Sequence, residues 1–256
     1  MEKDINLNQL RGKEIAVCGI KPVNYLAEFN TKAIKRLYFN AATAPSYKKL
    51  SSELAGLKKI YRLVTDEELT KIAASSRHGG VVAIIDLPKP DILDNIGLEN
   101  IIKQKKPMIV LDNVGNPNNT GAIVRSAAYF GFNNIILSGN SAGINQASYR
   151  VSEGGMEFVR FYTVKDLKTL SELSKGRLIM LGASLNGKTQ LRDIDSKIVP
   201  NRHPCLLFGN EETGLTKTDE SFCDILVKIE GSKQIDSLNV SVAASLFLYE
   251  LSNYYK

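Results

Sequence analysis

Short apolar segments alternate with amphipathic ones along almost the whole chain, and this alternation constrains the fold more than any other feature. Apolar runs of four to eight residues between turn signals predict buried strands, and the longer segments between them have helical spacing. Strands joined by helices pair in parallel, so we expect an α/β fold in which the C-terminal part has a mostly parallel sheet covered by helices on both faces and the N-terminal part forms a smaller α/β unit. The predicted strands are Glu14–Gly19, Lys35–Phe39, Ile60–Val64, Val81–Ile85, Met108–Leu111, Ile135–Leu137, Phe161–Val164, Leu178–Ala183, Cys205–Phe208 and Ile225–Ile229.

Helix boundaries follow from capping signals. A proline in the first position favours a helix over 22–30, and a glycine closes an amphipathic helix over 46–56. The run Thr65–Glu68 has the composition of a capping box, which predicts a helix start. Further helices are expected over 119–130 and after Asp166.

Two domains are expected, because 256 residues suit one large or two modest domains and the middle of the chain is rich in proline. Pro88 and Pro90 open a segment that carries the turn signals of a linker. We therefore place an N-terminal domain at residues 1–90, a linker with a short helix at 91–106, and a C-terminal domain at 107–256.

The net charge of +6 resides entirely in the first part of the chain. Residues 1–106 contain 18 Lys and Arg against 12 Asp and Glu, whereas residues 107–256 contain 15 of each kind. A basic module beside a neutral one suggests a nucleic-acid-docking domain attached to a second domain. The alternative is a solvated lysine-rich surface with no ligand.

Several classes of protein are disfavoured by composition. No apolar run reaches the roughly 18 residues of a membrane span, and the polar start of the chain (residues 1–14), for which no regular structure is expected, has no apolar signal core, so we expect a cytoplasmic protein. The three cysteines show no CxxC spacing, which argues against disulfides and a zinc site. With only two histidines, no metal site is expected.

The first polar motif, Asn113–Arg125, reads NVGNPNNTGAIVR and joins a predicted strand to a predicted helix. Ligands bind at the carboxyl ends of strands in such folds, and a planar, permanently charged guanidinium there suits a phosphate. Arg125 is therefore a candidate phosphate ligand. In the alternative interpretation, Asn119 caps the helix and Arg125 is a solvated side chain.

The second polar motif, Phe208–Thr216, reads FGNEETGLT. It resembles a phosphate-binding loop, but Leu215 stands where that loop requires its lysine, and GxGxxG is absent, so a nucleotide-binding enzyme is disfavoured. Glu211 follows the strand and is either an active-site carboxylate or an exposed loop acid. His78 precedes two glycines in the N-terminal domain, and we expect it to be a loop residue and not a catalyst.

The third polar motif lies within Asp224–Leu251, where a strand, a polar turn and a final apolar helix follow one another. Ser237 or Asn239 can cap that helix. The open amides of its first turn suit a polar or anionic ligand, although an ordinary capped helix explains the same pattern.

Taken together, the stretches NPNNTGAIVRSAAYFG, LLFGNEETGL and DSLNVSVAASLFLYE resemble, in order and spacing, the three motifs of the SpoU/TrmH family of RNA ribose 2′-O-methyltransferases in the SPOUT superfamily. The resemblance covers residues 107–256. The first domain is similar to the small RNA-binding domain of many members, with Gly19-Ile20 and His78-Gly79 at its landmarks. Two positions depart from the family pattern, because Lys228 replaces a proline and Lys21 replaces a histidine.

The resemblance implies transfer of a methyl group from S-adenosylmethionine to a ribose 2′-hydroxyl of rRNA or tRNA, by a homodimer whose C-terminal domain contains a deep trefoil knot. A catalytically silent RNA-binding or ribosome-assembly protein on the same scaffold is the alternative. The cofactor is then expected at the strand ends, near Ala183, Gly209, Val227 and Leu238.

The resemblance also implies roles for the polar residues of the motifs. Arg125 binds an RNA phosphate and orients the attacking hydroxyl, a role that suits a group that rarely loses its proton. The residues expected to hold Arg125 and the substrate in place are Asn119, Glu211, Ser237 and Asn239.

Overall fold

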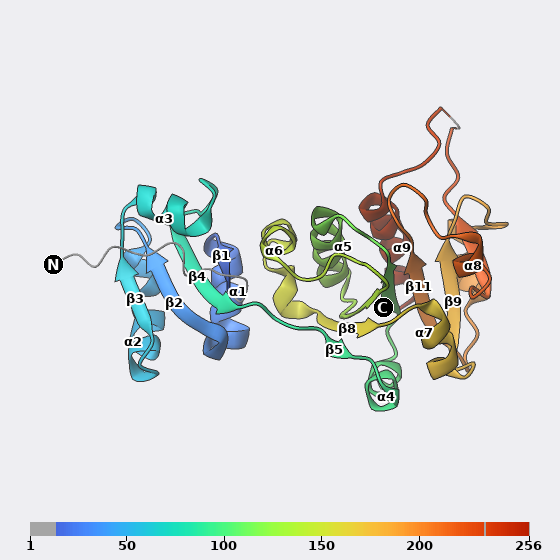
Figure 1. Cartoon of the computed structure of the whole chain (residues 1–256), viewed down its shortest axis with the longest axis horizontal. Helices are drawn as coiled ribbons and strands as arrows, with labels where there is room; N and C mark the ends of the chain where they lie inside the picture. The colour runs from blue at the N-terminus through green and yellow to red at the C-terminus, as the bar shows by residue number, and fades with distance from the viewer. Residues whose placement is uncertain (1–13, 233, 256) are drawn as a thin grey trace. The chain divides into compact units, whose positions relative to one another are not determined.

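Two separate sheets organise the chain (Figure 1). The computed structural model describes residues 14–232 and 234–255, so most of the segment 1–14, for which no regular structure was expected, lies outside these residues. The chain divides into two compact units. Unit 1 takes its residues from Met1–Pro88 and Ile144–Glu157, and unit 2 from Lys89–Gly143 and Phe158–Lys256.

Unit 1 contains a four-stranded sheet in the order β1-β4-β2-β3. All four predicted strands are present, and their bounds are β1 (Glu14–Cys18), β2 (Ile34–Phe39), β3 (Ile60–Leu63) and β4 (Val81–Asp86). β2 and β3 are parallel, but β4 runs antiparallel to both β1 and β2, so this sheet is mixed, in contrast to the mostly parallel sheet expected for the C-terminal domain.

The direction of β4 follows from the short connection before it. Helix α3 (Asp66–Ala73) has eight residues, and the chain then returns to the edge from which the helix started. There Val81 pairs with Phe39, at the carboxyl end of β2. Gly79 and Gly80 adopt φ angles of 58° and 80°, which turn the chain into β4 without a steric penalty.

The helices of unit 1 begin close to their predicted positions. α1 (Ile20–Asn30) starts two residues before Pro22, which its first turn accommodates, and α2 (Lys48–Gly56) ends at the predicted glycine. The capping box at the start of α3 is confirmed. The Thr65 side chain accepts from the Glu68 N–H, and the Glu68 carboxylate accepts from the Thr65 N–H. Short 3-10 segments lie at η2 (Thr31–Ala33) and η3 (Ala44–Tyr47).

A segment far along the chain completes unit 1. It contains α6 (Gln146–Ser152) and η4 (Gly155–Phe158). The Gln146 side chain accepts from the Ala16 N–H at 2.8 Å and donates to the Ala16 carbonyl at 2.7 Å. A single side chain thus satisfies backbone groups on the outer edge of β1, where a further strand would otherwise pair.

Unit 2 contains an eight-stranded sheet in the order β10-β12-β9-β11-β6-β7-β8-β5. Every neighbouring pair is parallel, so the predicted mostly parallel sheet is confirmed here. The strands are β5 (Asp91–Ile92), β6 (Met108–Asp112), β7 (Asn134–Ser138), β8 (Arg160–Val164), β9 (Leu178–Ala183), β10 (Thr189–Gln190), β11 (His203–Phe208) and β12 (Ile225–Lys228).

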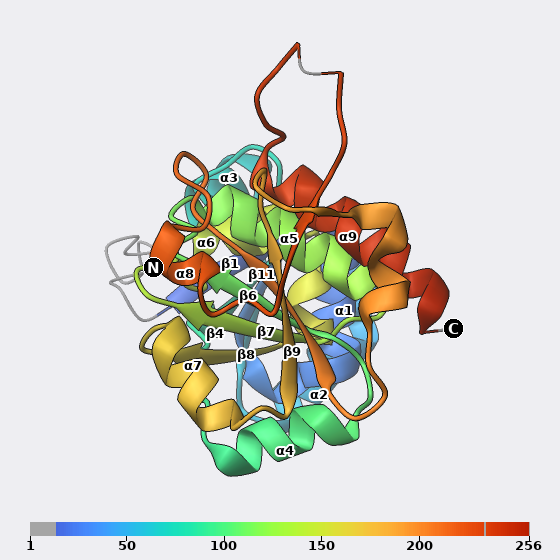
Figure 2. The same ribbon diagram turned by 90° about the vertical axis from the view of Figure 1, so that its right-hand side faces the viewer.

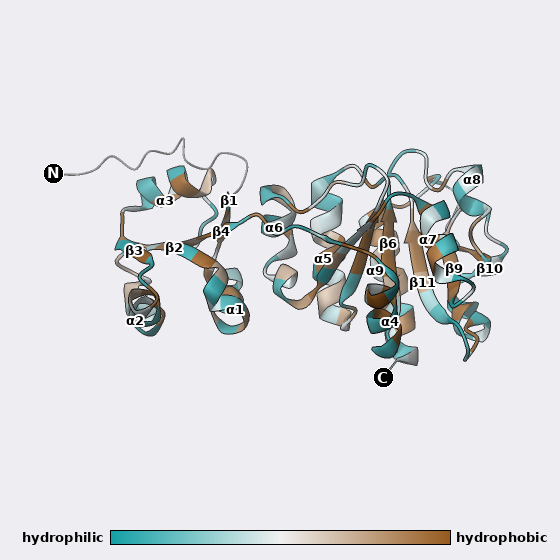
Figure 3. Cartoon of the chain, turned by 60° about the horizontal axis from the view of Figure 1, so that its bottom comes forward, coloured by the Kyte–Doolittle hydropathy of each residue, from teal (hydrophilic) through white to brown (hydrophobic). Residues whose placement is uncertain are grey.

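Helices cover both faces of this sheet, as expected (Figure 2). On one face, α4 (Asn95–Lys103) and α7 (Leu167–Ser174) bury Leu98 and Leu170 against the strands. On the other face lie α5 (Pro117–Phe130) and α9 (Val240–Tyr254). The central strands are mostly apolar, with buried polar residues such as Asp112 and Asn134 at their ends, and other polar residues lie on the outer helix faces and in the loops (Figure 3). A short helix, α8 (Lys217–Glu220), and the 3-10 segment η5 (Leu191–Lys197) complete the unit.

The segment 91–106, which was expected to be a linker, is ordered within unit 2. It supplies β5, which pairs with β8 at the sheet edge, and the predicted short helix, α4. The physical reason is apolar content, because Leu98 and Ile101 are completely buried in the core. No helix among the described residues is both long and apolar enough to cross a bilayer.

Candidate active site

The three polar motifs meet at the carboxyl edge of the unit 2 sheet. The first is the turn between β6 and α5, the second follows β11, and the third opens α9. Because β6 and β11 are parallel neighbours, the loops that follow them leave the sheet side by side. Stretches about 90 and 120 residues apart in sequence are joined here by direct hydrogen bonds.

Glu211 is the centre of this cluster. One carboxylate oxygen accepts from the Asn116 N–H at 2.9 Å and from the Asn119 side-chain amide at 2.9 Å. The other accepts from the Gly115 N–H at 3.1 Å. The carboxylate is partly buried and ties the loop after β11 to the first turn of α5, which differs from the alternative of an exposed loop acid.

These donors decide the charge state of Glu211. Partial burial raises the pKa of the carboxyl group, but the bonds from the Asn119 side chain and from backbone N–H groups act in the opposite direction and prevail. The net result is a pKa below the ordinary value, so Glu211 is an anion near neutral pH. A carboxylate with a lowered pKa and its lone pairs engaged by the protein is suited to positioning neighbours and poorly suited to accepting a proton.

Asn119 connects the second and third motifs. Its side-chain oxygen accepts from the Asn239 amide at 3.1 Å while its nitrogen donates to Glu211. Asn119 does not cap α5, as the alternative interpretation required, because that cap is Asn116, whose side chain accepts from the Asn118 N–H. An asparagine in the first turn of α5 is free to bridge two loops since the cap is provided elsewhere.

The start of α9 resolves the choice left open between Ser237 and Asn239. Asn239 is the cap, and its side-chain oxygen accepts from the Ser241 N–H at 2.8 Å. Ser237 is exposed two residues earlier, in the loop that leads from β12 to α9. The structure therefore joins Asn119, Glu211 and Asn239 in one network and leaves Ser237 outside it.

Asn210 was missed by sequence reasoning. Its side-chain nitrogen donates to the Asn113 carbonyl at 2.9 Å, and its oxygen accepts from the N–H groups of Glu212 and Thr213. Its backbone pairs in both directions with Gly214, which closes the loop. The available signal was an asparagine directly after a strand, since Asn side chains commonly bond the backbone of their own turn.

Three of the four residues expected near the cofactor lie on adjacent strand ends. Ala183 pairs with Val227 between β9 and β12, and β9 is also the neighbour of β11, which ends just before Gly209. A Cβ at position 209 would lie 2.3 Å from the backbone of Gly214, so only glycine fits this turn. Leu238 is half exposed in the loop before α9.

Arg125 lies on a different face of α5 from Asn119. Six residues separate them, which corresponds to about 9 Å of rise and about a third of a turn around the axis. Arg125 is exposed, as is Tyr129 one turn later. Among the described residues, no hydrogen bond joins the Arg125 guanidinium to the network of Glu211, Asn119 and Asn239.

The remaining singled-out residues have local roles. The His78 ring is buried, and its Nδ1 accepts from the Gly80 N–H at 3.1 Å, so it stabilises the turn into β4. Lys228 ends β12 and pairs with Gln190 of β10, and Lys21 is exposed on α1. Over residues 14–232 and 234–255, no group of three or more His, Cys, Asp or Glu side chains is arranged to hold a metal ion.

Comparison with known proteins gives matches over both units. Residues 106–249 match the model of the SpoU rRNA Methylase family, and residues 16–91 match that of RNA 2′-O ribose methyltransferase substrate binding. The 23S rRNA (guanosine-2′-O-)-methyltransferase RlmB of Neisseria meningitidis is 30% identical over 237 residues, which cover 91% of this chain and 93% of the relative. That of Acinetobacter baylyi is 33% identical over 72% of this chain and 74% of its own.

Solved structures share the fold at lower identity. The SpoU methyltransferase AviRb of Streptomyces viridochromogenes, in complex with AdoMet, has a TM-score of 0.74 at 22% identity, covering 98% of this chain and 93% of its own. An AdoMet-bound rRNA methyltransferase of Sinorhizobium meliloti has a TM-score of 0.76 at 20% identity, covering 95% and 88%.

Proposed function

This chain belongs to the SpoU rRNA methylase family, and from that membership we propose that it transfers a methyl group from S-adenosylmethionine to a ribose 2′-hydroxyl of rRNA. The observation that carries the proposal is the convergence of three distant motifs on Glu211 and Asn119. The relatives' name specifies a guanosine of 23S rRNA, so we propose a guanosine 2′-hydroxyl as the acceptor.

The ends of β9, β11 and β12 suit the proposed cofactor. Ala183 and Gly209 carry little or no side chain, so we assign their backbone N–H and carbonyl groups to the edge of the adenine ring, and Val227 is apolar. Leu238, at the start of α9, would cover the ring from the adjoining loop. When bound, S-adenosylmethionine supplies the methyl group as a positively charged sulfonium.

The protein's own groups would orient the hydroxyl. Glu211 is held by donors from the first motif, so it fixes the two loops and does not act as a base. Arg125 is exposed and permanently charged, and we assign it to an RNA phosphate, where it positions the 2′-hydroxyl and stabilises the developing negative charge. Ser237 and Asn239 lie on the same loop and complete the wall of the site.

A homodimer is part of the proposal. Helices α5 and α9 expose several apolar and aromatic side chains, and Phe130 contacts both Tyr129 and Tyr249 edge to face. Val242 is 48% exposed and Tyr129 84% exposed. An exposed apolar patch of this kind marks an interaction surface, and a second copy of the chain fits it by two-fold symmetry. Arg125 would then lie at the border of the interface.

A trefoil knot, with the region 205–251 threaded through a loop, is also proposed. Support comes from close backbone passages in this region. A Cβ on Gly187 would lie 2.8 Å from the backbone of residues 226–228, and η5 packs against α9 (Figure 2). Such passages bring the loop between β9 and β11 against the final segment of the chain, which a knot requires.

The RNA would be docked by the N-terminal domain, residues 1–90, and methyl transfer carried out by residues 107–256. The basic excess of the first part supports this division, and its affinity for RNA should then weaken steeply with salt. We place the reaction in the cytoplasm, where rRNA is exposed during ribosome assembly.

Calorimetry and methylation mapping test the proposal together. The folded chain should bind S-adenosylmethionine, and millimolar ATP or NAD should not compete. Mapping of 2′-O-methyl groups in rRNA from cells with and without the gene should reveal one lost site. A folded chain that binds RNA but not S-adenosylmethionine would instead be a silent RNA-binding or ribosome-assembly protein.

A further inference from the structure

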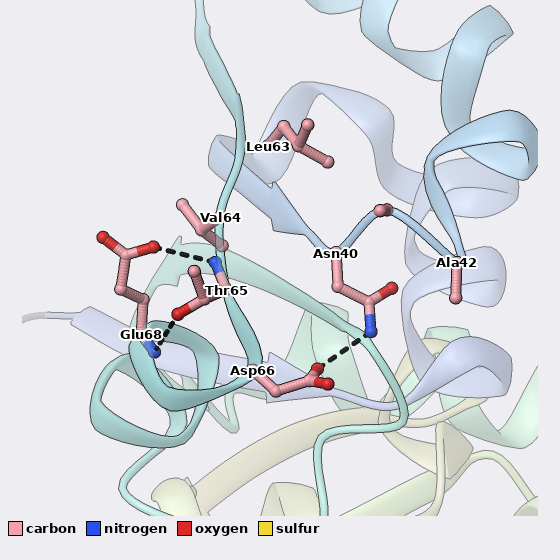
Figure 4. Close-up of a pocket in the computed structure, with 8 residues that line it drawn as sticks. Asn40, Ala42, Leu63, Val64, Thr65, Asp66 and Glu68 are labelled. Carbon is pink, nitrogen blue, oxygen red and sulfur yellow. Dashed lines mark hydrogen bonds between the residues drawn. The ribbon is translucent and has the colours of Figure 1, made fainter.

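A pocket of about 590 Å³ lies at the loop edge of unit 1, well away in sequence from the residues assigned to methyl transfer (Figure 4). Its lining comes from the turn after β2 and from the segment that joins β3 to α3. The lining residues are Asn40, Ala41, Ala42, Leu63, Val64, Thr65, Asp66 and Glu68. A volume of this size accommodates a small planar ligand.

The turn after β2 is fixed in place by its own hydrogen bonds. The Asn40 side-chain oxygen accepts from the Thr43 N–H at 3.0 Å, and the Thr43 hydroxyl donates to the Gly80 carbonyl at 2.7 Å. The Asn40 N–H bonds the same carbonyl at 3.0 Å. The Asn40 amide nitrogen is therefore held pointing towards Asp66, to which it donates at 2.8 Å (Figure 4).

The pocket offers a defined set of polar groups. Asp66 is an exposed carboxylate, and the structure gives it one side-chain donor, so acceptor capacity on both oxygens faces the pocket. The second N–H of the Asn40 amide lies beside it as a donor. Glu68 also lines the pocket, and one of its carboxylate oxygens accepts from the Thr65 N–H of the capping box.

The lining also defines what the ligand is not. It contains two carboxylates and neither Lys nor Arg, so a phosphate or another anion would be repelled. Leu63 is 62% exposed and points to the same side as Asn40 and Asp66 (Figure 4). The occupant should therefore have an apolar face to cover Leu63 and a polar edge rich in donors.

We propose that this pocket binds an unpaired guanine of the RNA, at a nucleotide other than the one that is methylated. Guanine presents an acceptor, O6, followed by two adjacent donors, N1–H and the N2 amino group. That order matches the Asn40 amide followed by the two Asp66 oxygens. Adenine and cytosine place a ring acceptor against the carboxylate, and uracil flanks its one donor with two carbonyls, so none of them matches.

Strand β3, which contributes Leu63 to the pocket, has exposed side chains that can contact the nucleotides next to the bound guanine. β3 is an edge strand, and Tyr61, which is 42% exposed, lies two residues before Leu63 and therefore on the same face. An exposed aromatic ring stacks on a neighbouring base. Lys58 is exposed in the turn that leads into β3 and supplies a positive charge for a phosphate, whereas Arg62 projects from the opposite face of the strand.

This inference rests on the proposed RNA-binding role of unit 1, and its test separates the two. The full chain is titrated by fluorescence anisotropy with three labelled RNAs, UUUGUUU, UUUAUUU and the inosine analogue, which lacks the N2 amino group. We expect the guanosine RNA to bind about tenfold more tightly than the adenosine RNA, with inosine between them. Methyl transfer to rRNA is measured on the same preparation.

Two neighbouring carboxylates provide the matched variants. Asp66→Asn keeps the shape of the side chain but replaces one acceptor by a donor, and it should abolish the guanosine preference. Glu67→Gln removes the same charge from the adjacent residue, which does not line the pocket, and should slightly strengthen binding of all three RNAs while keeping the preference. Leu63→Ser should weaken binding of all three, because it removes the apolar surface beneath the base.

The outcomes are distinct. Equal affinity for the three RNAs, or no binding of any, overturns the guanine site, and so does a preference that survives in Asp66→Asn. If rRNA is methylated in that case, the proposed function stands without this site. If the guanosine preference is present and depends on Asp66 but no methyl group is transferred, the site stands and the enzymatic role fails.

Discussion

The loops at the carboxyl edges of the two sheets are both built around a glycine, but they are held by different kinds of contact. In unit 2, a Cβ on Gly209 would meet the backbone of Gly214 at 2.3 Å and the Leu215 nitrogen at 2.4 Å. In unit 1, a Cβ on Gly80 would meet the Thr43 methyl group at 2.7 Å and the Asn40 side chain at 3.0 Å. Gly209 therefore packs against backbone atoms, whereas Gly80 packs against side-chain atoms.

The carboxylates of the two loops also differ in how many of their hydrogen bonds the protein itself provides. Glu211 in unit 2 accepts two backbone N–H groups and the Asn119 amide, so the protein itself saturates it. Asp66 in unit 1 receives the Asn40 amide and keeps further acceptor capacity. Polar groups with similar positions relative to a sheet therefore have different uses. One set fixes loops around a site, and the other is directed outward to a ligand.

The largest effect is expected from adding a methyl group to each glycine. Gly209→Ala forces two backbone segments apart, and we expect a loss of at least about 3 kcal/mol in the free energy of unfolding, together with loss of S-adenosylmethionine binding. Gly80→Ala displaces side chains and strains a residue at φ 80°, so we expect about 1–2 kcal/mol. Urea unfolding of both variants measures the difference, and equal losses would remove the contrast between the loops.

The next largest effect is expected on the rate of methyl transfer when Arg125, which lies outside the hydrogen-bond network of Glu211, is replaced. Arg125→Ala should reduce single-turnover methyl transfer roughly 100-fold, the scale of removing an electrostatic positioning group, which corresponds to about 2.7 kcal/mol of barrier. Stability should change by less than about 1 kcal/mol because the side chain is exposed and alanine favours helix. Arg125→Lys should not restore the rate, since a point charge cannot replace a planar fork.

S-adenosylmethionine binding by calorimetry is the control for Arg125→Ala, because backbone at the strand ends is expected to hold the cofactor. A near-normal rate would leave Arg125 as an ordinary surface cation. The chemistry would then have to be assigned to residues of the network, which the saturated state of Glu211 argues against.

Sequence reasoning predicted the elements well where local signals decide them. The β9 bounds, the Thr65 capping box and the end of α2 are as predicted, because apolar runs and caps are local properties. It did not predict the antiparallel direction of β4, which depends on the edge to which the chain returns after α3. Nor did it predict that Gln146 bonds Ala16, a contact across 130 residues.

The candidate site shows the same division. The motifs pointed to three loops that lie together in the structure, where hydrogen bonds join Asn119, Glu211 and Asn239. The direction of the side chains was not readable from spacing, so Asn119 was a candidate cap and Arg125 was expected beside the network. Asn210 was missed because a turn asparagine has the same sequence signature whether it closes a loop or supports a site.

A smaller effect is expected from neutralising the saturated carboxylate. Glu211→Gln replaces an acceptor by a donor facing the N–H groups of Gly115 and Asn116, and should cost about 1–2 kcal/mol of unfolding free energy at pH 7. The pKa of Glu211 is lowered in the folded state, so its contribution is present above the ordinary value of about 4.3 and is lost as the pH falls through the folded-state pKa. Wild type and variant should therefore converge in acid.

Glu212→Gln is the control for this prediction, because Glu212 is the exposed neighbour in the same loop. It should change stability by less than about 0.5 kcal/mol at any pH. A Glu211→Gln variant that differs from wild type by a constant amount down to pH 3 would show that the charge of Glu211 is irrelevant and only the geometry of the bonds matters.

The smallest effect is expected for Glu157, a partly buried carboxylate of unit 1 that contrasts with Glu211. Burial raises the pKa of Glu157 to about 7, and among the described residues its Oε1 has no hydrogen-bond partner. Between about pH 4.5 and 7 the folded state holds a proton that the unfolded chain has lost, so stability falls as the pH rises through that window. Glu211 and Glu157 thus have opposite pH dependence.

Glu157→Gln keeps the size of the side chain and removes the ionisation. Because the residue is only partly buried, solvent screens the effect, and we expect a gain of about 1 kcal/mol at pH 8 with little change at pH 5. Urea unfolding at the two pH values measures it, with Glu153→Gln as the exposed control in the same segment. Identical pH dependence in wild type and Glu157→Gln would mean that Glu157 ionises normally. The contrast with Glu211 would then rest on hydrogen bonding alone, because burial without donors would have no measurable effect on stability in unit 1.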